Sequence, residues 1–167
     1  MENTSLQTLF ERQQLFFASG KTRDLIFRKE ALKKLRSAIL MHEDELYRAL
    51  HKDLHKSPFE SYATEIGFVL DELRFHLKNL HKWVKPKRVS SSIVSFPAKG
   101  YKTYEPLGTV LIIAPWNYPF QLMMAPLIGA ISAGNTIIIK PSEIAENTAL
   151  VIEKIINSSF EKEYIHV

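Results

Sequence analysis

The sequence predicts an α/β fold in which a layer of helices precedes an open parallel sheet. Three observations indicate it. Apolar residues recur at helical spacing through the first half of the chain, the runs 110–114 and 137–139 are apolar at every position, and a helical stretch lies between these two runs. Runs that are apolar on both faces are typical of parallel strands covered by helices on each side.

Helices are expected throughout the first half. The first should end at Gly20, and Thr22 should cap the second. The third begins at Ser57-Pro58-Phe59-Glu60, which combines a capping serine, a proline at the first helical position and a glutamate at the third. It should end before Pro86. The expected buried stripes are Leu6, Leu9, Phe10 and Phe17, then Leu25, Leu32, Leu35 and Ile39, then Ile66, Val69, Leu70, Leu73, Leu77 and Leu80.

A β-hairpin is expected after the helices. The segments 93–96 and 101–104 favour strands, and the turn-forming residues 97–100 separate them.

The first apolar strand stops at Pro115-Trp116-Asn117-Tyr118-Pro119. Two prolines in five residues fix backbone angles and remove donors, so we expect a rigid turn at the carboxyl end of the strand. Ligands of open α/β sheets bind at this edge. Such a turn could hold the Asn117 side-chain amide against a developing negative oxygen. Asparagine is also a common turn residue, so this plainer interpretation stays open.

A helix with Pro126 in its first turn and Gly134 at its C-terminal cap should lead to the second strand. That strand ends at Lys140, followed by Pro141-Ser142-Glu143. Lys140 offers three donors and Glu143 a carboxylate that can accept both hydroxyls of a ribose, so together they could hold an adenosine. The alternative is a solvated strand end with an acidic residue at a helix start.

These residues resemble the leading part of the aldehyde dehydrogenase superfamily. Its PWN and KPSE motifs occur here as Pro115-Trp116-Asn117 and Lys140-Pro141-Ser142-Glu143, with GN between them at Gly134-Asn135. The turn PWNYP and the helical sequence before it look most like the class 3 branch, which includes fatty and aromatic aldehyde dehydrogenases. The resemblance spans nearly all of the chain, but only about the first third of a family member.

The resemblance implies a role for each matching residue. Asn117 matches the asparagine whose amide, with a backbone N–H, stabilises the oxyanion of the tetrahedral intermediate. Tyr118 falls at an aromatic wall of the aldehyde channel, or is a core residue. The residues expected at the NAD(P) site are Ile113, Ala114, Pro115, Trp116, Lys140, Ser142 and Glu143.

The implied architecture is a Rossmann-like NAD-binding domain. Its helical part is expected at 1–88, a projecting β-hairpin oligomerisation arm at 89–105, and the incomplete parallel sheet at 106–167. Residues 164–167 resemble a third strand just beginning. A truncated sheet with an unpaired apolar edge is therefore expected, and such an edge favours aggregation.

The implied function is NAD(P)-dependent oxidation of an aldehyde to a carboxylic acid. In the family a cysteine thiolate attacks the aldehyde, and a thiohemiacetal and a thioester follow. The 167 residues contain no cysteine, so they are not expected to turn over aldehyde. The alternatives are a CoA-acylating aldehyde dehydrogenase and a truncated, non-catalytic segment that binds a nucleotide or dimerises. NAD is slightly favoured over NADP, because Glu143 would repel the additional phosphate.

Other partners are not expected. The net charge of +4 at pH 7 is spread along helix faces, so a solvated surface accounts for it and nucleic-acid binding is not predicted. His51 and His55 have helical ligand spacing but lack the glutamate of an HExxH motif, so no metal is predicted. No apolar stretch is long enough to span a membrane, and the polar start favours a cytoplasmic location. By resemblance, the hairpin at 90–104 should pair two subunits of a homodimer through Phe96, Tyr101 and Tyr104.

Overall fold

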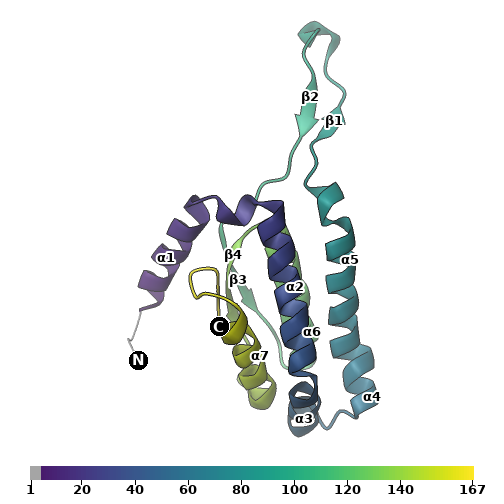
Figure 1. Ribbon diagram of the computed structural model, residues 1–167, viewed down its shortest axis with the longest axis vertical. Helices are drawn as coiled ribbons and strands as arrows, with labels where there is room; N and C mark the ends of the chain where they lie inside the picture. Colours follow the sequence, from purple (N-terminus) through teal and green to yellow (C-terminus); the bar gives the residue numbers. More distant parts are fainter. Residues whose placement is uncertain (1–4) are drawn as a thin grey trace.

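The computed structural model describes residues 5–167 and has the predicted α/β architecture (Figure 1). The helices are α1 Leu6–Ala18, α2 Leu25–Met41, α3 Glu43–Leu54, α4 Pro58–Ser61, α5 Gly67–Trp83, α6 Gln121–Ala133 and α7 Glu146–Ser159. The strands are β1 Lys87–Val89, β2 Gly100–Lys102, β3 Thr109–Ile113, β4 Thr136–Lys140 and β5 Ile165–His166. Residues 1–4, which belong to the polar start on which the expected cytoplasmic location partly rests, lie outside the described residues.

The main sheet has the order β3-β4-β5, and all its strands are parallel. Helices α6 and α7 make the two crossovers, so the predicted β-α-β unit is confirmed and β5 adds a third strand. Strands β3 and β4 end in register, because Ile113 pairs with Lys140. The Ala114 N–H then donates to the Lys140 carbonyl at 3.2 Å. The two polar turns beyond these strands therefore start at the same edge of the sheet.

Only one face of this sheet is well covered within residues 5–167. Ile137 and Ile139 of β4 are buried in the hydrophobic core together with residues of α2, α5, α6 and α7. On β3, however, Leu111 is 61% exposed and Ile113 is 66% exposed. The expectation of helices on both faces is therefore wrong for this part of the chain. The run is apolar on both faces, and although α1 and α6 contact β3, Leu111 and Ile113 remain exposed.

Polar side chains join the helical layer to the sheet over long sequence distances. Gln13 of α1 is buried and donates to the carbonyls of Ile137 and Lys162, each at 3.0 Å. Arg28 of α2 donates to the Ser132 carbonyl at the end of α6 at 3.1 Å. These bonds satisfy buried carbonyls that would otherwise cost free energy, and they fix where α1 and α2 lie.

Three details of the helices differ from the prediction. Leu6 is exposed and Gln13 takes a buried position of α1, so the predicted apolar stripe is only partly correct. Thr22 lies within a short 3₁₀ turn, and Asp24 caps α2 instead by accepting from two backbone amides. Pro126 lies inside α6, not in its first turn, because the helix already begins at Gln121.

Two predicted helix signals are confirmed. The Ser57 side chain accepts from the Glu60 amide and caps α4. A π-helical turn, Tyr62–Ile66, joins α4 to α5, so the predicted helix continues to Trp83. Gly134 ends α6 in the left-handed conformation, with φ of 90°.

The predicted hairpin exists; its second strand overlaps the predicted segment 101–104, but its first strand lies earlier in the chain than predicted. β1 pairs with β2 in antiparallel fashion at residues 87–89 and 100–102. The segment 93–96, predicted as a strand, contains a 3₁₀ turn, Ile93–Ser95, at the tip. The hairpin projects away from the helices and the sheet (Figure 1). No helix within residues 5–167 has both the length and the apolar character that a membrane span requires.

Gly134 and Gly129 provide a matched test of the α6 terminus. A Cβ at Gly134 would lie 2.7 Å from the Thr22 carbonyl oxygen and 2.8 Å from the Arg28 guanidinium. Left-handed backbone is also unfavourable for alanine, so Gly134→Ala should lower the free energy of unfolding by about 2 kcal/mol or more. A Cβ at Gly129 meets nothing within 4 Å.

Gly129→Ala should therefore raise the free energy of unfolding by about 0.5–1 kcal/mol through helix propensity. Urea unfolding of the two variants measures both changes. Equal changes would contradict the left-handed cap.

Candidate active site

The predicted site residues lie on two turns at the carboxyl edge of the sheet. One turn, residues 114–120, follows β3, and the other, residues 141–145, follows β4. The register of β3 and β4 places the two turns next to each other. Asn117 and the pair Lys140 and Glu143, which helix α6 separates in the sequence, therefore share one edge.

Asn117 has a fixed backbone and a free side chain. Its carbonyl oxygen accepts from the Lys56 ammonium at 3.4 Å. Its side chain is exposed, and within residues 5–167 its amide makes no hydrogen bond. The amide is thus available to a ligand, as an oxyanion donor must be.

A buried ion pair lies beneath this turn. The Lys56 Nζ is 2.5 Å from Glu65 Oε1. Glu65 is fully buried and Lys56 is 6% exposed. Glu65 Oε2 accepts from the backbone amides of Phe120 and Gln121 at 2.9 and 3.1 Å. This carboxylate caps α6, which has no side-chain cap of its own, and it explains why the helix starts before Pro126.

Sequence reasoning missed both members of this pair. Glu65 lies four residues before Val69 and eight before Leu73, so it belongs to the apolar face of the helix that the sequence predicted. An acidic residue on such a face requires a buried partner. That signal could have identified Glu65, but nothing local identifies Lys56 as its partner.

Lys140 and Glu143 are bonded to each other at the second turn. The Lys140 ammonium donates to Glu143 Oε1, and both side chains are exposed. The hydrogen bond from Lys140 lowers the pKa of Glu143, and a backbone hydrogen bond at Glu143 adds to the effect. Glu143 is therefore a carboxylate at neutral pH, as an acceptor of ribose hydroxyls must be. Of the plainer interpretation, the solvated strand end fits, because both side chains are exposed, but Glu143 does not start a helix, since α7 begins only at Glu146.

The other predicted cofactor residues differ in exposure. Ile113, Pro115 and Trp116 are exposed at the sheet edge, whereas the Ala114 side chain is buried, so only its backbone can face a ligand. The Ser142 hydroxyl accepts from the Ile144 amide at 3.3 Å and shapes the turn. Tyr118 is 39% exposed, and the Lys56 ammonium lies 4.1 Å from its ring centroid.

Asp53 of α3 binds the start of α7, directly after the second turn. One carboxylate oxygen accepts from the Asn147 amide at 3.2 Å, and the other from the Thr148 amide at 2.7 Å. The side chains of the same two residues also donate to Asp53, at 2.8 and 2.7 Å. Asp53 is therefore the N-terminal cap of α7, which has no local side-chain cap.

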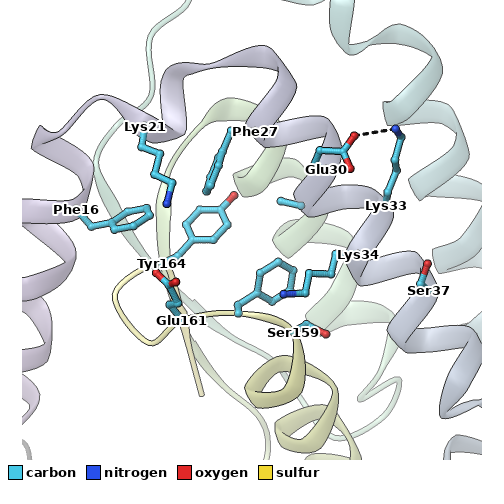
Figure 2. Close-up of a pocket in the computed structure, with 12 residues that line it drawn as sticks. Phe16, Lys21, Phe27, Glu30, Lys33, Lys34, Ser37, Ser159, Glu161 and Tyr164 are labelled. Carbon is cyan, nitrogen blue, oxygen red and sulfur yellow. Dashed lines mark hydrogen bonds and ion pairs between the residues drawn. The ribbon is translucent and has the colours of Figure 1, made fainter.

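An aromatic cavity lies elsewhere in the molecule. Its volume is about 500 Å³, and it lies between α1, α2 and the connection from α7 to β5. Figure 2 shows Phe16, Phe27 and Tyr164 around it, with Lys21 above them. None of the predicted site residues lines this cavity. Within residues 5–167, no group of three or more His, Cys, Asp or Glu is placed to hold a metal ion.

Known proteins match the chain along nearly all of its length. A family model described as the aldehyde dehydrogenase family matches residues 11–167. The 4,4'-diaponeurosporen-aldehyde dehydrogenase of Staphylococcus aureus is 50% identical over 162 residues, which are 97% of this chain and 35% of that protein. Aldehyde dehydrogenase family 3 member A2 of Macaca fascicularis is 44% identical over 146 residues, or 87% of this chain and 30% of that protein.

A solved structure shows the same fold. The substrate-bound state of Staphylococcus aureus AldH superposes with a TM-score of 0.95 at 50% identity, covering 97% of this chain and 35% of that one. The chain thus spans about a third of the length of the relatives it matches.

Removal of the Asp53 carboxylate should weaken the second turn. Asp53→Ala deletes four hydrogen bonds at the start of α7. Loss of such a cap should lower the free energy of unfolding by about 2 kcal/mol. Amide hydrogen exchange at Asn147 and Thr148 should become faster. Lys52→Ala, at an exposed neighbour on α3, should change stability by less than about 0.5 kcal/mol. Equal effects of the two variants would contradict the capping role.

Proposed function

The chain belongs to the aldehyde dehydrogenase family, and from this premise we propose that it forms part of an NAD(P)-dependent enzyme that oxidises an aldehyde to a carboxylic acid. The main support is the meeting of two groups at one sheet edge. The Asn117 amide is free, and the Lys140–Glu143 pair lies on the adjoining turn.

Asn117 would act as a catalytic residue. Attack of a thiolate on an aldehyde places negative charge on the carbonyl oxygen, and a fixed amide N–H stabilises this charge. The attacking cysteine is not among these residues, which contain none. We therefore expect the complete enzyme to react through a thiohemiacetal and a thioester, and we expect the 167-residue chain alone to be inactive.

Lys140 and Glu143 would hold the adenosine ribose of the cofactor. Lys140 supplies donors and the Glu143 carboxylate accepts from ribose hydroxyls, while Trp116 and Ile113 offer exposed apolar surface beside them. When bound, the cofactor would supply the hydride acceptor needed to oxidise the thiohemiacetal to the thioester. Glu143 would disfavour the extra phosphate of NADP, but the adjacent Lys140 offsets part of that repulsion. The preference for NAD should therefore be slight.

The hairpin would join two subunits into a homodimer. Its tip and strands expose large apolar side chains, with Phe96 83% exposed and Tyr101 58% exposed. Exposed apolar groups on a projecting arm favour burial against another chain. We propose a cytoplasmic enzyme whose substrate is a small-molecule aldehyde, with no nucleic-acid partner.

Asn117→Ala in the complete enzyme tests the oxyanion role. Loss of one donor should lower kcat by on the order of a hundredfold or more, because the donor acts on charge that develops during reaction. The Kd for the cofactor should stay nearly the same, since the amide faces the aldehyde. Steady-state kinetics measures kcat, and a fluorescence titration measures the Kd for the cofactor. An unchanged kcat would rule out the role.

Lys140→Ala tests the adenosine assignment. It should raise the KM for the cofactor several-fold and leave the KM for the aldehyde unchanged, because uniform binding of the cofactor is lost. Lys154→Ala is a suitable control, since it removes an exposed ion pair away from this edge. If only the KM for the aldehyde changes, Lys140 does not hold the cofactor.

A further inference from the structure

We propose that Lys56 and Glu65 are positioning residues that fix the Asn117 turn in its reactive geometry. The inference rests on the proposed function, because it concerns the same turn. Both residues are buried, and both contact the turn from its buried side.

The Lys56 ammonium makes three contacts beneath the turn. It donates to Glu65 Oε1 at 2.5 Å and to the Asn117 carbonyl at 3.4 Å, and it lies 4.1 Å from the ring centroid of Tyr118. Two of its donors serve these hydrogen bonds, and its charge also faces the aromatic ring. One cation therefore holds both the backbone of Asn117 and the ring that follows it.

Glu65 holds the other end of the same turn. Its second oxygen accepts from the Phe120 and Gln121 amides at the start of α6. The carboxylate thus joins the N-terminus of α6 to the cation that holds Asn117. The segment between these points includes Pro119, which is buried and has a restricted backbone. The turn is fixed at both ends and stiff in between.

Stability alone does not account for a charged pair at this place. Burial of two charges costs several kcal/mol per ion, and a well-packed apolar pair often gives equal or greater stability. What an apolar pair cannot do is donate to the Asn117 carbonyl and accept from two helix amides. The directional bonds, and not the burial, are what this pair provides.

The lysine also links this turn to the second one. It follows Asp53 by three residues, and Asp53 caps α7 directly after the Lys140–Glu143 turn. Between them, His55 adopts the left-handed conformation, with φ of 55°, and ends α3. One short segment, residues 53–56, therefore contacts the backbone of the first turn and the backbone at the start of α7, directly after the second turn.

The complete enzyme provides the test, through kinetics at a temperature well below the unfolding midpoint of every variant. Lys56→Met keeps the length of the side chain but removes its donors. It should lower kcat at least tenfold and change the KM for the cofactor by less than twofold. Lys52→Met, at an exposed site on α3, is the matched control and should leave both constants unchanged.

A double-mutant cycle with Asn117→Ala distinguishes positioning from general damage. If Lys56 acts through Asn117, the double variant should have the same kcat as Asn117→Ala alone. Additive losses, or an unchanged kcat for Lys56→Met, would overturn the proposal. If Lys56→Met does not fold, Glu65→Gln replaces it, because the glutamine oxygen can still accept from the Phe120 and Gln121 amides.

The same cycle separates failure of this inference from failure of the proposed function. If Asn117→Ala itself leaves kcat unchanged, the oxyanion role is wrong and the positioning role falls with it. If Asn117→Ala slows the enzyme and neither Lys56→Met nor Glu65→Gln does, only the positioning role is wrong.

Discussion

The in-register pairing of β3 with β4 is the constraint on which the site depends. It is fixed at the amino end, where the Asn135 side chain accepts from the Leu107 and Gly108 amides at 2.8 and 3.1 Å. The hydroxyls of Thr109 and Thr136 also lie 2.9 Å apart there. A slip of one residue would turn the buried isoleucines of β4 out of the core. Because that slip is excluded, the carboxyl ends of both strands meet and the two polar turns share one edge.

Carboxylates from the helical half then hold the turns that the sheet brings together. Neither α6 nor α7 has a local side-chain cap at its N-terminus. Glu65 caps α6 from 55 positions earlier in the chain, and Asp53 caps α7 from 94 positions earlier. Each bond satisfies orphan amides and places a negative charge at the positive end of a helix dipole. The helical layer is thus part of the support of the site, and not only a cover for the sheet.

Local signals in the sequence predicted most of the fold but not this support. The strands, the Ser57 cap and the Gly134 terminus each depend on residues within a few positions, so a single sequence reveals them. The start of α6 was predicted too late, at Pro126, because its cap comes from Glu65. The uncovered face of β3 was missed for a related reason: an apolar run shows that a face can be buried, but not which element buries it. Asn117 and Lys140 were predicted as site residues through their motifs, whereas nothing near Lys56 in the sequence points to its partners.

The two turns differ in how firmly the protein holds their functional groups, and this difference suits the chemistry proposed for each turn. At the first turn, the hydrogen bonds from Lys56 and to Glu65 involve backbone atoms, namely the Asn117 carbonyl and the amides at the start of α6, and the Asn117 side-chain amide remains free. An oxyanion donor works best when it needs no rearrangement as charge develops. At the second turn, Lys140 and Glu143 are exposed and bonded to each other. In the proposed role, a ribose would enter between them or displace their bond, at little cost in solvent. A rigid turn therefore suits the chemical step, and an adaptable pair suits a cofactor that must bind and leave.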